Sequence, residues 1–403
     1  MIPFSPPRID QKVVDEVSAA LLSGWITTGP RTKLFEKQIS EYCGAKTTVA
    51  ESSWTTGMEV FLRWWGIGPG DEVIVPVYTY CACANVVIHT GAKVVFVDIS
   101  NENFNLSLDA VRNAITERTK VIMPVDFGGF PCDYDALLEL ANEMKNCFKP
   151  SNDLQQKLGR ILIAADAAHS FGAVYKGIKS GSLADVTCFS FHAVKNLTTA
   201  EGGAICYNLP TDFDHDAIYK AFNIKILHGQ SKDAHAKTQK GAWRYDVLEA
   251  GYKCNMTDIQ AAIGLVELER YSETLARRKQ ITEKYNDAFG KENIFCIPPS
   301  ENDYATTSYH LYPLRINGIT EGQRDAIIAE ISEKDIAVNV HFQPLPLLTA
   351  YKQLGYRIDD FPEAYRKYAN EISLPIYFQL TDKEVEQIIN AVKGAVKKVV
   401  GHD

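Results

Sequence analysis

The sequence lacks the features that mark several large classes of protein. Its 403 residues contain no unbroken run of about eighteen apolar residues, and its start, MIPFSPPRIDQ, lacks the charged beginning and apolar centre of a secretion signal. Lysine and arginine (42) are outnumbered by aspartate and glutamate (50), so no basic surplus indicates a nucleic-acid partner. We therefore expect a cytoplasmic protein without a membrane span or a nucleic-acid partner.

The sequence also lacks the common signatures of metal and nucleotide sites. Nine scattered cysteines include no CxxC pair, which favours reduced thiols over disulfides or a zinc site, and Cys81 and Cys83 are expected to be small core side chains. No GxGxxG follows the first apolar run, and neither GxxxxGK[ST] nor HExxH occurs. The histidines His228, His310 and His341 are scattered, and we expect structural hydrogen bonding from them rather than metal binding.

What the sequence does contain is a series of short apolar runs between residues 47 and 207, separated by helical or polar segments. The runs are TTVAES, DEVIVPVYTY, AKVVFVDI, TKVIMPVDF, RILIAADAA, VTCFSF and GAICY. Continuous β-branched runs are typical of strands buried on both faces, and the spacing leaves room for crossover helices. The sequence therefore predicts an α/β fold with a mostly parallel central sheet.

The remaining chain predicts a second, smaller domain. Residues 256–290 have apolar positions at helical spacing, and the strand signals YHLYPLRI and IAVNVHF and the closing helix DKEVEQIINAVKGAVKKVV follow. We expect a large domain over residues 1–255 and a linking helix with a small α+β domain over 256–403. The polar stretch 143–160 is interpreted as a surface insertion.

Two charged residues stand where strands of this sheet are expected to end. Asp166 closes the run RILIAAD, and Lys195 follows the run VTCFSF. Ligands of such sheets bind beyond the carboxyl ends of the strands. A buried, unpaired charge costs several kcal/mol, so each residue either reaches water or a loop amide, or takes part in chemistry. For Asp166, one chemical partner is a pyridinium nitrogen, which a carboxylate keeps protonated.

Other strand ends carry groups that suit a phosphate and a planar ring. Ser53, Thr55 and Thr56 stand between a strand and a helix, where free amides and hydroxyls bind anions, although a plain helix cap would look the same. Ser190 adds a hydroxyl, and Tyr80, like Tyr78, either offers an aromatic face or packs in the core. Together with Lys195 and Asp166, these groups predict a pyridoxal 5'-phosphate (PLP) site.

Longer motifs in a fixed order resemble those of a known family. They are SGWITTGP, GIGPGDEVIVP, DAAHSFGA, FSFHAVKNLTTAEGG and GYKCNMTDIQAAIGLVELER. The sequence resembles, over essentially its whole length, the nucleotide-sugar aminotransferases of the DegT and StrS type, which are PLP enzymes with the aspartate aminotransferase fold (fold type I). The variants WITTGP, DAAH, FHAVKN and GYKxN are similar to the branch that aminates C4 of UDP-linked 4-keto sugars.

The resemblance implies a role for each matching residue. Lys195 would form the Schiff base and Asp166 would pair with the pyridine nitrogen, while His169 would contact the phenolic oxygen and Tyr80 would stack on the ring. Ser53, Thr55, Thr56 and Ser190 would hold the phosphate, which a second subunit would complete through Lys253 or Asn255. This sharing implies a homodimer. The candidates for binding the substrate are Trp25, Thr27, Gly29 and His341.

The implied activity is amino transfer from glutamate to C4 of a UDP-linked, 6-deoxy, N-acetylated 4-keto sugar, for a surface polysaccharide or glycan. Alternatives on the same fold are a C3-aminotransferase and a sugar dehydratase, although dehydratases replace the lysine by histidine or add a cysteine-bound cluster. An amino-acid aminotransferase would need an arginine such as Arg31 or Arg244 for a second carboxylate. A non-catalytic PLP-binding regulatory protein is a further alternative, which the presence of both Lys195 and Asp166 opposes. Trp54, where the family commonly has a small residue, would narrow the pocket or pack outward.

Overall fold

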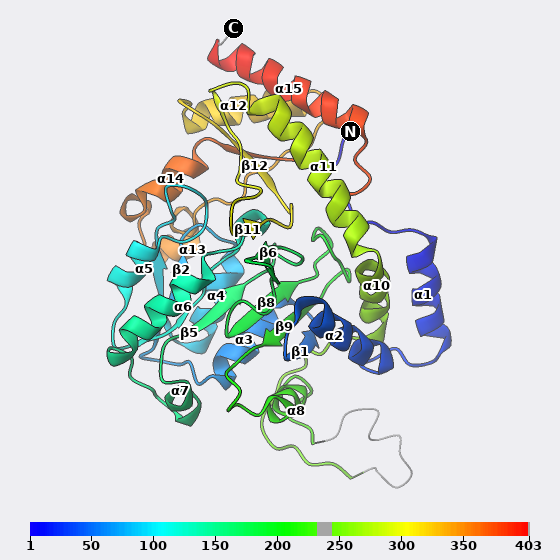
Figure 1. The fold of residues 1–403 in the computed structure, drawn as a ribbon, viewed down its shortest axis with the longest axis vertical. Coiled ribbons are helices and arrows are strands. Elements are labelled where there is room, and N and C mark those ends of the chain that lie inside the picture. Colours follow the sequence, from blue (N-terminus) through cyan, green and yellow to red (C-terminus); the bar gives the residue numbers. More distant parts are fainter. Residues whose placement is uncertain (232–243, 402–403) are drawn as a thin grey trace.

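A seven-stranded sheet forms the centre of the protein (Figure 1), in a computed structural model that describes residues 1–231 and 244–401. The strand order is β1-β9-β8-β5-β4-β2-β3, and all neighbours are parallel except β9, which runs antiparallel to β1 and β8. The strands are β1 Thr47–Glu51, β2 Glu72–Pro76, β3 Lys93–Val97, β4 Thr119–Ile122, β5 Leu162–Asp166, β8 Val186–Ser190 and β9 Gly203–Tyr207. Each predicted apolar run forms one of these strands, so the predicted α/β fold is confirmed.

Helices cover both faces of this sheet, because side chains alternate along buried strands. Val73 and Val75 of β2 join the apolar cluster of α3, α4 and α8, whereas Ile74 joins the cluster of α5 and α6 on the other face. Helices α2 and α10 cover that second face near β9. The helices of this part are α1 Gln11–Leu22, α2 Pro30–Cys43, α3 Trp54–Trp64, α4 Cys81–Thr90, α5 Leu108–Ala114, α6 Tyr134–Glu143, α7 Asp153–Leu158, α8 His215–Lys225 and α10 Asp258–Glu269.

A second apolar core lies beside the first, around a small antiparallel sheet with the order β10-β12-β13. In Figure 1, α11 runs from the large sheet towards α12 and α15, which pack on one another. The elements are β10 Phe295–Cys296, β12 Tyr312–Ile316, β13 Glu371–Leu374, α11 Tyr271–Phe289, α12 Glu321–Ser332 and α15 Asp382–Val400. The predicted strand at YHLYPLRI and the predicted closing helix are confirmed by β12 and α15.

The chain between these elements contains several short pieces. The short strands β6 Val174–Tyr175, β7 Ile178–Lys179 and β11 Ala305–Thr306 form a third sheet, and the short helices α13 Thr349–Gln353 and α14 Pro362–Tyr368 follow α12. Single 3-10 turns span Phe127–Gly129, Met144–Asn146, Leu345–Leu347 and Ile358–Asp360. None of the helices among the described residues is long and apolar enough to span a bilayer.

The predicted strand at IAVNVHF is wrong. Only isolated bridges form there, from Ile336 to Ile2 and from Asn339 to Ser373. The reason is that nearby side chains take the amides that a ladder would need: Val340 N–H donates to the Asn339 carboxamide, and His341 N–H donates to Glu371. The segment instead becomes an irregular connection that carries His341.

The single helix predicted over residues 256–290 is also wrong, because the chain leaves the helical conformation at Arg270 (φ −106°, ψ 13°). The Arg270 guanidinium is held there by Asp10 and Glu267. Helix α10 packs on α1 and α2, whereas α11 packs on α15. The packing partner therefore changes at Arg270, and the domain division after residue 255 stays a prediction.

The polar stretch 143–160 is not a detached surface insertion. Its Gln155 is fully buried, and Gln155 and Asn152 both donate to the main-chain oxygen of Trp65, at 2.9 and 3.0 Å. Two polar side chains thus bond one main-chain oxygen that would otherwise lack a partner beside α3. The polar composition of residues 143–160 therefore reflects these buried hydrogen bonds as well as exposure to solvent.

Asp258 ties α10 to the start of α2, and its replacement should destabilise the fold. Its buried carboxylate accepts from Gly29 N (2.8 Å), Arg31 N (3.1 Å), and both N (2.9 Å) and Oγ1 (2.7 Å) of Thr32. Asp258→Ala leaves these donors without an acceptor, so we expect the free energy of unfolding to fall by about 2–4 kcal/mol in urea titrations. Asp287→Ala, at an exposed position of α11, should change it by less than about 0.5 kcal/mol. Equal effects of the two substitutions would contradict the capping role.

Candidate active site

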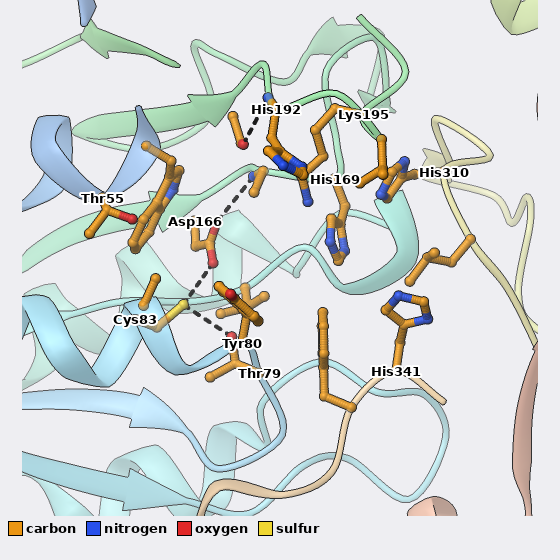
Figure 2. A pocket seen from close by; sticks show the side chains of 18 of the residues that line it. Thr55, Thr79, Tyr80, Cys83, Asp166, His169, His192, Lys195, His310 and His341 are labelled. Carbon is orange, nitrogen blue, oxygen red and sulfur yellow. Dashed lines mark hydrogen bonds between the residues drawn. The ribbon is translucent and has the colours of Figure 1, made fainter. Parts of the chain in front are cut away.

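A cavity of about 460 Å³ lies beyond the carboxyl ends of the parallel strands, on the side that faces the small sheet. Figure 2 shows its walls: Asp166 ends β5, Thr79 and Tyr80 follow β2, and Lys195 lies in the turns after β8. His310 and His341 enter from the part that carries the small sheet. Of the residues predicted from the sequence, the cavity brings together Ser53, Thr55, Tyr80, Asp166, His169, Ser190, Lys195 and His341.

Lys195 lies in the cavity wall with its amine unpaired. Within the described part of the chain, this amine forms neither a hydrogen bond nor an ion pair. Burial lowers the pKa of Lys195 to about 8, against the opposing effect of the Asp166 carboxylate. The amine is therefore neutral in a larger fraction of molecules than an exposed lysine, and a neutral amine can act as a nucleophile or a base.

Asp166 is held by neutral donors. The Cys83 thiol donates to its Oδ2 (2.8 Å) and Ala168 N–H donates to its Oδ1 (3.0 Å), while Thr79 Oγ1 lies 3.0 Å from the Cys83 sulfur. Burial raises the pKa of Asp166, and the donors together with Lys195 partly offset this effect. Cys83 is thus a hydrogen-bond donor to Asp166 as well as a core side chain. Its spacing from Cys81 in the sequence did not indicate this contact.

Three histidines surround the cavity: His169, and two of the histidines that are scattered along the sequence, His310 and His341. Both of the latter make the expected structural hydrogen bonds, His310 with Asn196 and His341 with Ser373. The rings of His169 and His310 have centroids 4.4 Å apart, and His341 lines the same cavity. Gly128 N–H donates to His169 Nδ1 (3.2 Å), so a neutral His169 carries its proton on Nε2. Burial holds the pKa of His169 and His310 well below the usual range, and that of His341 at about 3. All three rings are therefore neutral.

The first turn of α3 forms another wall. Ser53 caps it by accepting from Thr56 N–H (3.1 Å), and Thr56 Oγ1 bonds back to Ser52 and Ser53, so Thr55 but not Thr56 lines the cavity. Trp54 does not pack outward: it lines the cavity, and its buried Nε1–H has no acceptor at full hydrogen-bonding geometry. A Cβ on Gly203 would lie 2.5 Å from Trp54 N, so only glycine lets β9 approach this helix end.

The residues present fit pyridoxal phosphate. Asp166 is a buried carboxylate whose near partners are neutral donors, and a protonated ring nitrogen would supply the missing cation. Thr55, Ser190 and the start of α3 offer hydroxyls and amides to a phosphate, and the His169 Nε2–H can donate to a phenolate oxygen. The volume also falls in the range of small-molecule sites. The individual roles stay predictions.

The remaining predicted residues form a separate cluster outside this chain's cavity. Asn255 Nδ2 donates to Thr28 Oγ1 (2.5 Å), Lys253 Nζ donates to the Asn255 carboxamide, and Trp25 Nε1 donates to Thr28 O (3.1 Å). Thr27 accepts from Asp258 N–H through its main-chain oxygen, and the Gly29 N–H is taken by Asp258. Candidates for substrate binding and for cross-subunit binding thus share one surface. The predicted residues in this cluster are Trp25, Thr27, Gly29, Lys253 and Asn255.

Comparison with known proteins gives concordant results. Residues 7–393 match the profile of the DegT/DnrJ/EryC1/StrS aminotransferase family. The spore coat polysaccharide biosynthesis protein SpsC of Bacillus subtilis is 38% identical, over 98% of this chain and 97% of its own. The UDP-4-amino-4-deoxy-L-arabinose–oxoglutarate aminotransferase of Shewanella sediminis is 34% identical, over 100% and 98%.

Solved structures extend this likeness to the fold. A Streptococcus pneumoniae protein named as a sugar aminotransferase, Spr1654, superposes in its PMP form with a TM-score of 0.96 and 46% identity, over 99% of this chain and 100% of that one. Its PLP form superposes with a TM-score of 0.95 and 45% identity, over 99% of both chains.

Proposed function

The chain belongs to the DegT/DnrJ/EryC1/StrS aminotransferase family, and from this premise we propose that it transfers an amino group from glutamate to C4 of a UDP-linked 4-keto sugar. The sugar we propose is 6-deoxy and N-acetylated, and its product enters the synthesis of a surface polysaccharide or glycan. The observation that carries this proposal is the cavity that joins Lys195, Asp166 and three neutral histidines.

The enzyme is a PLP-dependent aminotransferase. When bound, the cofactor supplies an electron sink for charge that develops on the carbon losing its proton. We propose that Lys195 Nζ removes and returns that proton, that Asp166 keeps the ring nitrogen protonated, and that His169 donates from Nε2 to the ring oxygen. Trp54 and Phe342 line the same cavity and contribute apolar surface beside these groups.

Several observations support a sugar as amino acceptor. SpsC acts in polysaccharide biosynthesis and the Shewanella relative acts on a UDP-linked amino sugar, by their names. The arginines weighed for an amino-acid acceptor do not line the cavity, and Arg31 is instead paired with Glu16 at 2.8 Å. Neutral imidazoles suit hydroxyl groups better than carboxylates, since they exchange hydrogen bonds without charge.

An amination assay tests this proposal directly. Purified enzyme loaded with PLP is given glutamate and a panel of nucleotide-linked 3-keto and 4-keto sugars, and the product is identified by NMR. We expect amination of a UDP-linked 4-keto-6-deoxy sugar, with the configuration of the new amine read from coupling constants. Amination at C3, dehydration, or turnover with amino-acid acceptors alone would refute the assignment.

We also propose a homodimer whose two cavities are each completed by the other subunit. Among the described residues, Lys195 is the one lysine or arginine that lines the cavity, so the charges of a phosphate and of glutamate call for further donors. The cluster of Lys253 and Asn255 lies outside its own cavity and carries a cation, part-buried and with a pKa lowered by burial. Either residue would reach the partner's phosphate.

Subunit mixing tests this sharing. The variants Lys195→Ala and Lys253→Ala/Asn255→Ala should each be nearly inactive, yet a mixture refolded or exchanged together should recover about a quarter of the wild-type rate. The reason is that half of the randomly formed dimers contain one site with all native residues. No recovery from mixtures shown by native mass spectrometry to contain heterodimers would contradict the shared site.

A further inference from the structure

His341 lines the cavity (Figure 2). It is the end of a chain of buried polar groups that runs into the small sheet. Its Nδ1 lies 2.9 Å from Ser373 Oγ, and Ser373 Oγ–H donates to Glu371 Oε1 at 2.5 Å. The other Glu371 oxygen accepts from His341 N–H at 3.0 Å. Ser373 and Glu371 are both on β13 and fully buried. We call these three residues the relay.

The hydrogen bonds of the relay determine which nitrogen of His341 carries the proton. A serine hydroxyl has one proton. Burial raises the pKa of Glu371 to about 8, and above that pH the ionised carboxylate can only accept, so Ser373 donates to Glu371 and accepts from His341 Nδ1–H. A neutral ring has one N–H, and burial together with Lys195 lowers the pKa of His341 to about 3. Nε2 therefore presents a lone pair to the cavity.

The ring of His341 is fixed in this orientation from several sides. Phe4 stacks on it, with ring centroids 5.4 Å apart and an angle of 25° between the planes. Tyr78 Oη–H donates to the His341 main-chain oxygen at 2.9 Å. The acceptor is thus held in place before any ligand arrives, which is the condition for a selective hydrogen bond.

We propose that Glu371 and Ser373 are positioning residues that hold His341 in the Nδ1–H tautomer, so that its bare Nε2 accepts a hydrogen bond from a hydroxyl group of the sugar substrate. A lone pair attracts a hydroxyl hydrogen and repels a carboxylate oxygen, so this position suits the hydroxylated acceptor and not the carboxylates of glutamate. The inference rests on the proposed function for the identity of its ligand, but the tautomer is a property of the protein alone.

Glu371→Gln should invert the relay. The main-chain N–H of His341 can only donate, so the glutamine must turn its oxygen towards it and its NH₂ towards Ser373. Ser373 then accepts from the glutamine and donates to His341 Nδ1, which moves the ring proton to Nε2. The side chain keeps its shape, while the acceptor in the cavity becomes a donor.

The tautomer is measured by long-range ¹H–¹⁵N NMR on protein labelled in its histidines, with His341→Gln identifying the signals. At pH 9, where Glu371 is mostly ionised, we expect Nδ1–H in the wild type and in Ser373→Thr, which retains the hydroxyl, loss of this preference in Ser373→Ala, and Nε2–H in Glu371→Gln. An Nε2–H signal in the wild type, or an unchanged tautomer in Glu371→Gln, would overturn the relay. No substrate is needed for this measurement.

Kinetics then test what the relay recognises. Ser373→Ala should raise KM for the keto sugar about tenfold and leave the half-reaction with glutamate unchanged, while Ser373→Thr should restore the wild-type KM. Ser332→Ala, a change on the outside of α12, serves as the control with wild-type constants. Equal damage to both half-reactions in Ser373→Ala would overturn the proposal. If the wild type aminates no keto sugar, the proposed function fails, and the NMR result decides the relay by itself.

Discussion

Lys195→Ala is expected to lower the rate of amino transfer by at least about 10³-fold while the protein keeps its fold. The amine of Lys195 is the one lysine amine that lines the cavity among the described residues, and burial makes its neutral form accessible near neutral pH. Removing it takes away the group that moves the proton at the α carbon of glutamate. The readout is exchange of the α hydrogen of glutamate in D₂O, followed by NMR.

Two comparisons separate this chemical role from a structural one. Small primary amines added to Lys195→Ala should restore part of the exchange rate, because they can enter the vacated space and act as the base. Lys37→Ala, at an exposed lysine of α2, should exchange at the wild-type rate. Wild-type exchange in Lys195→Ala would remove Lys195 from the mechanism.

The lowered pKa of Lys195 has its own signature in the cofactor-free protein. A lysine with a pKa of about 8 is mostly neutral at pH 9, whereas a lysine at the ordinary value of 10.5 is still mostly charged. Competitive labelling with acetic anhydride, read by peptide mass spectrometry, should therefore show Lys195 reacting along a curve with its midpoint near pH 8. A midpoint near the ordinary value would mean that water reaches the amine freely.

Asp166→Asn is expected to lower the rate about 100- to 1,000-fold. The amide has nearly the shape of the carboxylate and can keep the contact to Ala168 N–H, but it carries no charge to keep a ring nitrogen protonated. Its NH₂ also meets the Cys83 thiol, which now has to turn. We expect PLP affinity to fall as well, measured by equilibrium dialysis. A rate within about twofold of the wild type would show that the carboxylate has no role in the chemistry.

Substitutions at Cys83 test how hydrogen bonding to Asp166 controls the pKa of that carboxyl. Cys83→Ser keeps a donor to Asp166, whereas Cys83→Ala removes it and lets burial raise the pKa of Asp166 further. A carboxyl with a higher pKa stays protonated to a higher pH, so the acid side of the PLP-affinity profile should move upward in Cys83→Ala and much less in Cys83→Ser. Identical profiles in the two variants would contradict this role of the thiol.

Much of the fold followed from local pattern. Each apolar run between residues 47 and 207 became a strand of the central sheet, because continuous β-branched runs have few other stable environments. The predictions failed where particular side-chain hydrogen bonds, and not the spacing of apolar residues, determined the backbone conformation. Arg270 broke a helix whose apolar spacing continued across it, and Asn339 and Glu371 took the amides that would have made residues 336–342 a strand.

The sequence by itself determined the chemical groups of the site, because Asp166, Ser190 and Lys195 are carried at or just beyond the ends of strands whose order along the chain sets their side of the sheet. Only the tertiary structure decided what surrounds them. Cys83 on Asp166, Trp54 beside Asp166 in the cavity wall, and His310 and His341 beside His169 depend on contacts between segments far apart in the chain. Periodicity in the sequence predicts which face of a helix or strand is buried. Tertiary packing decides which side chains contact that face, and these contacts set the pKa values and the histidine tautomers of the site.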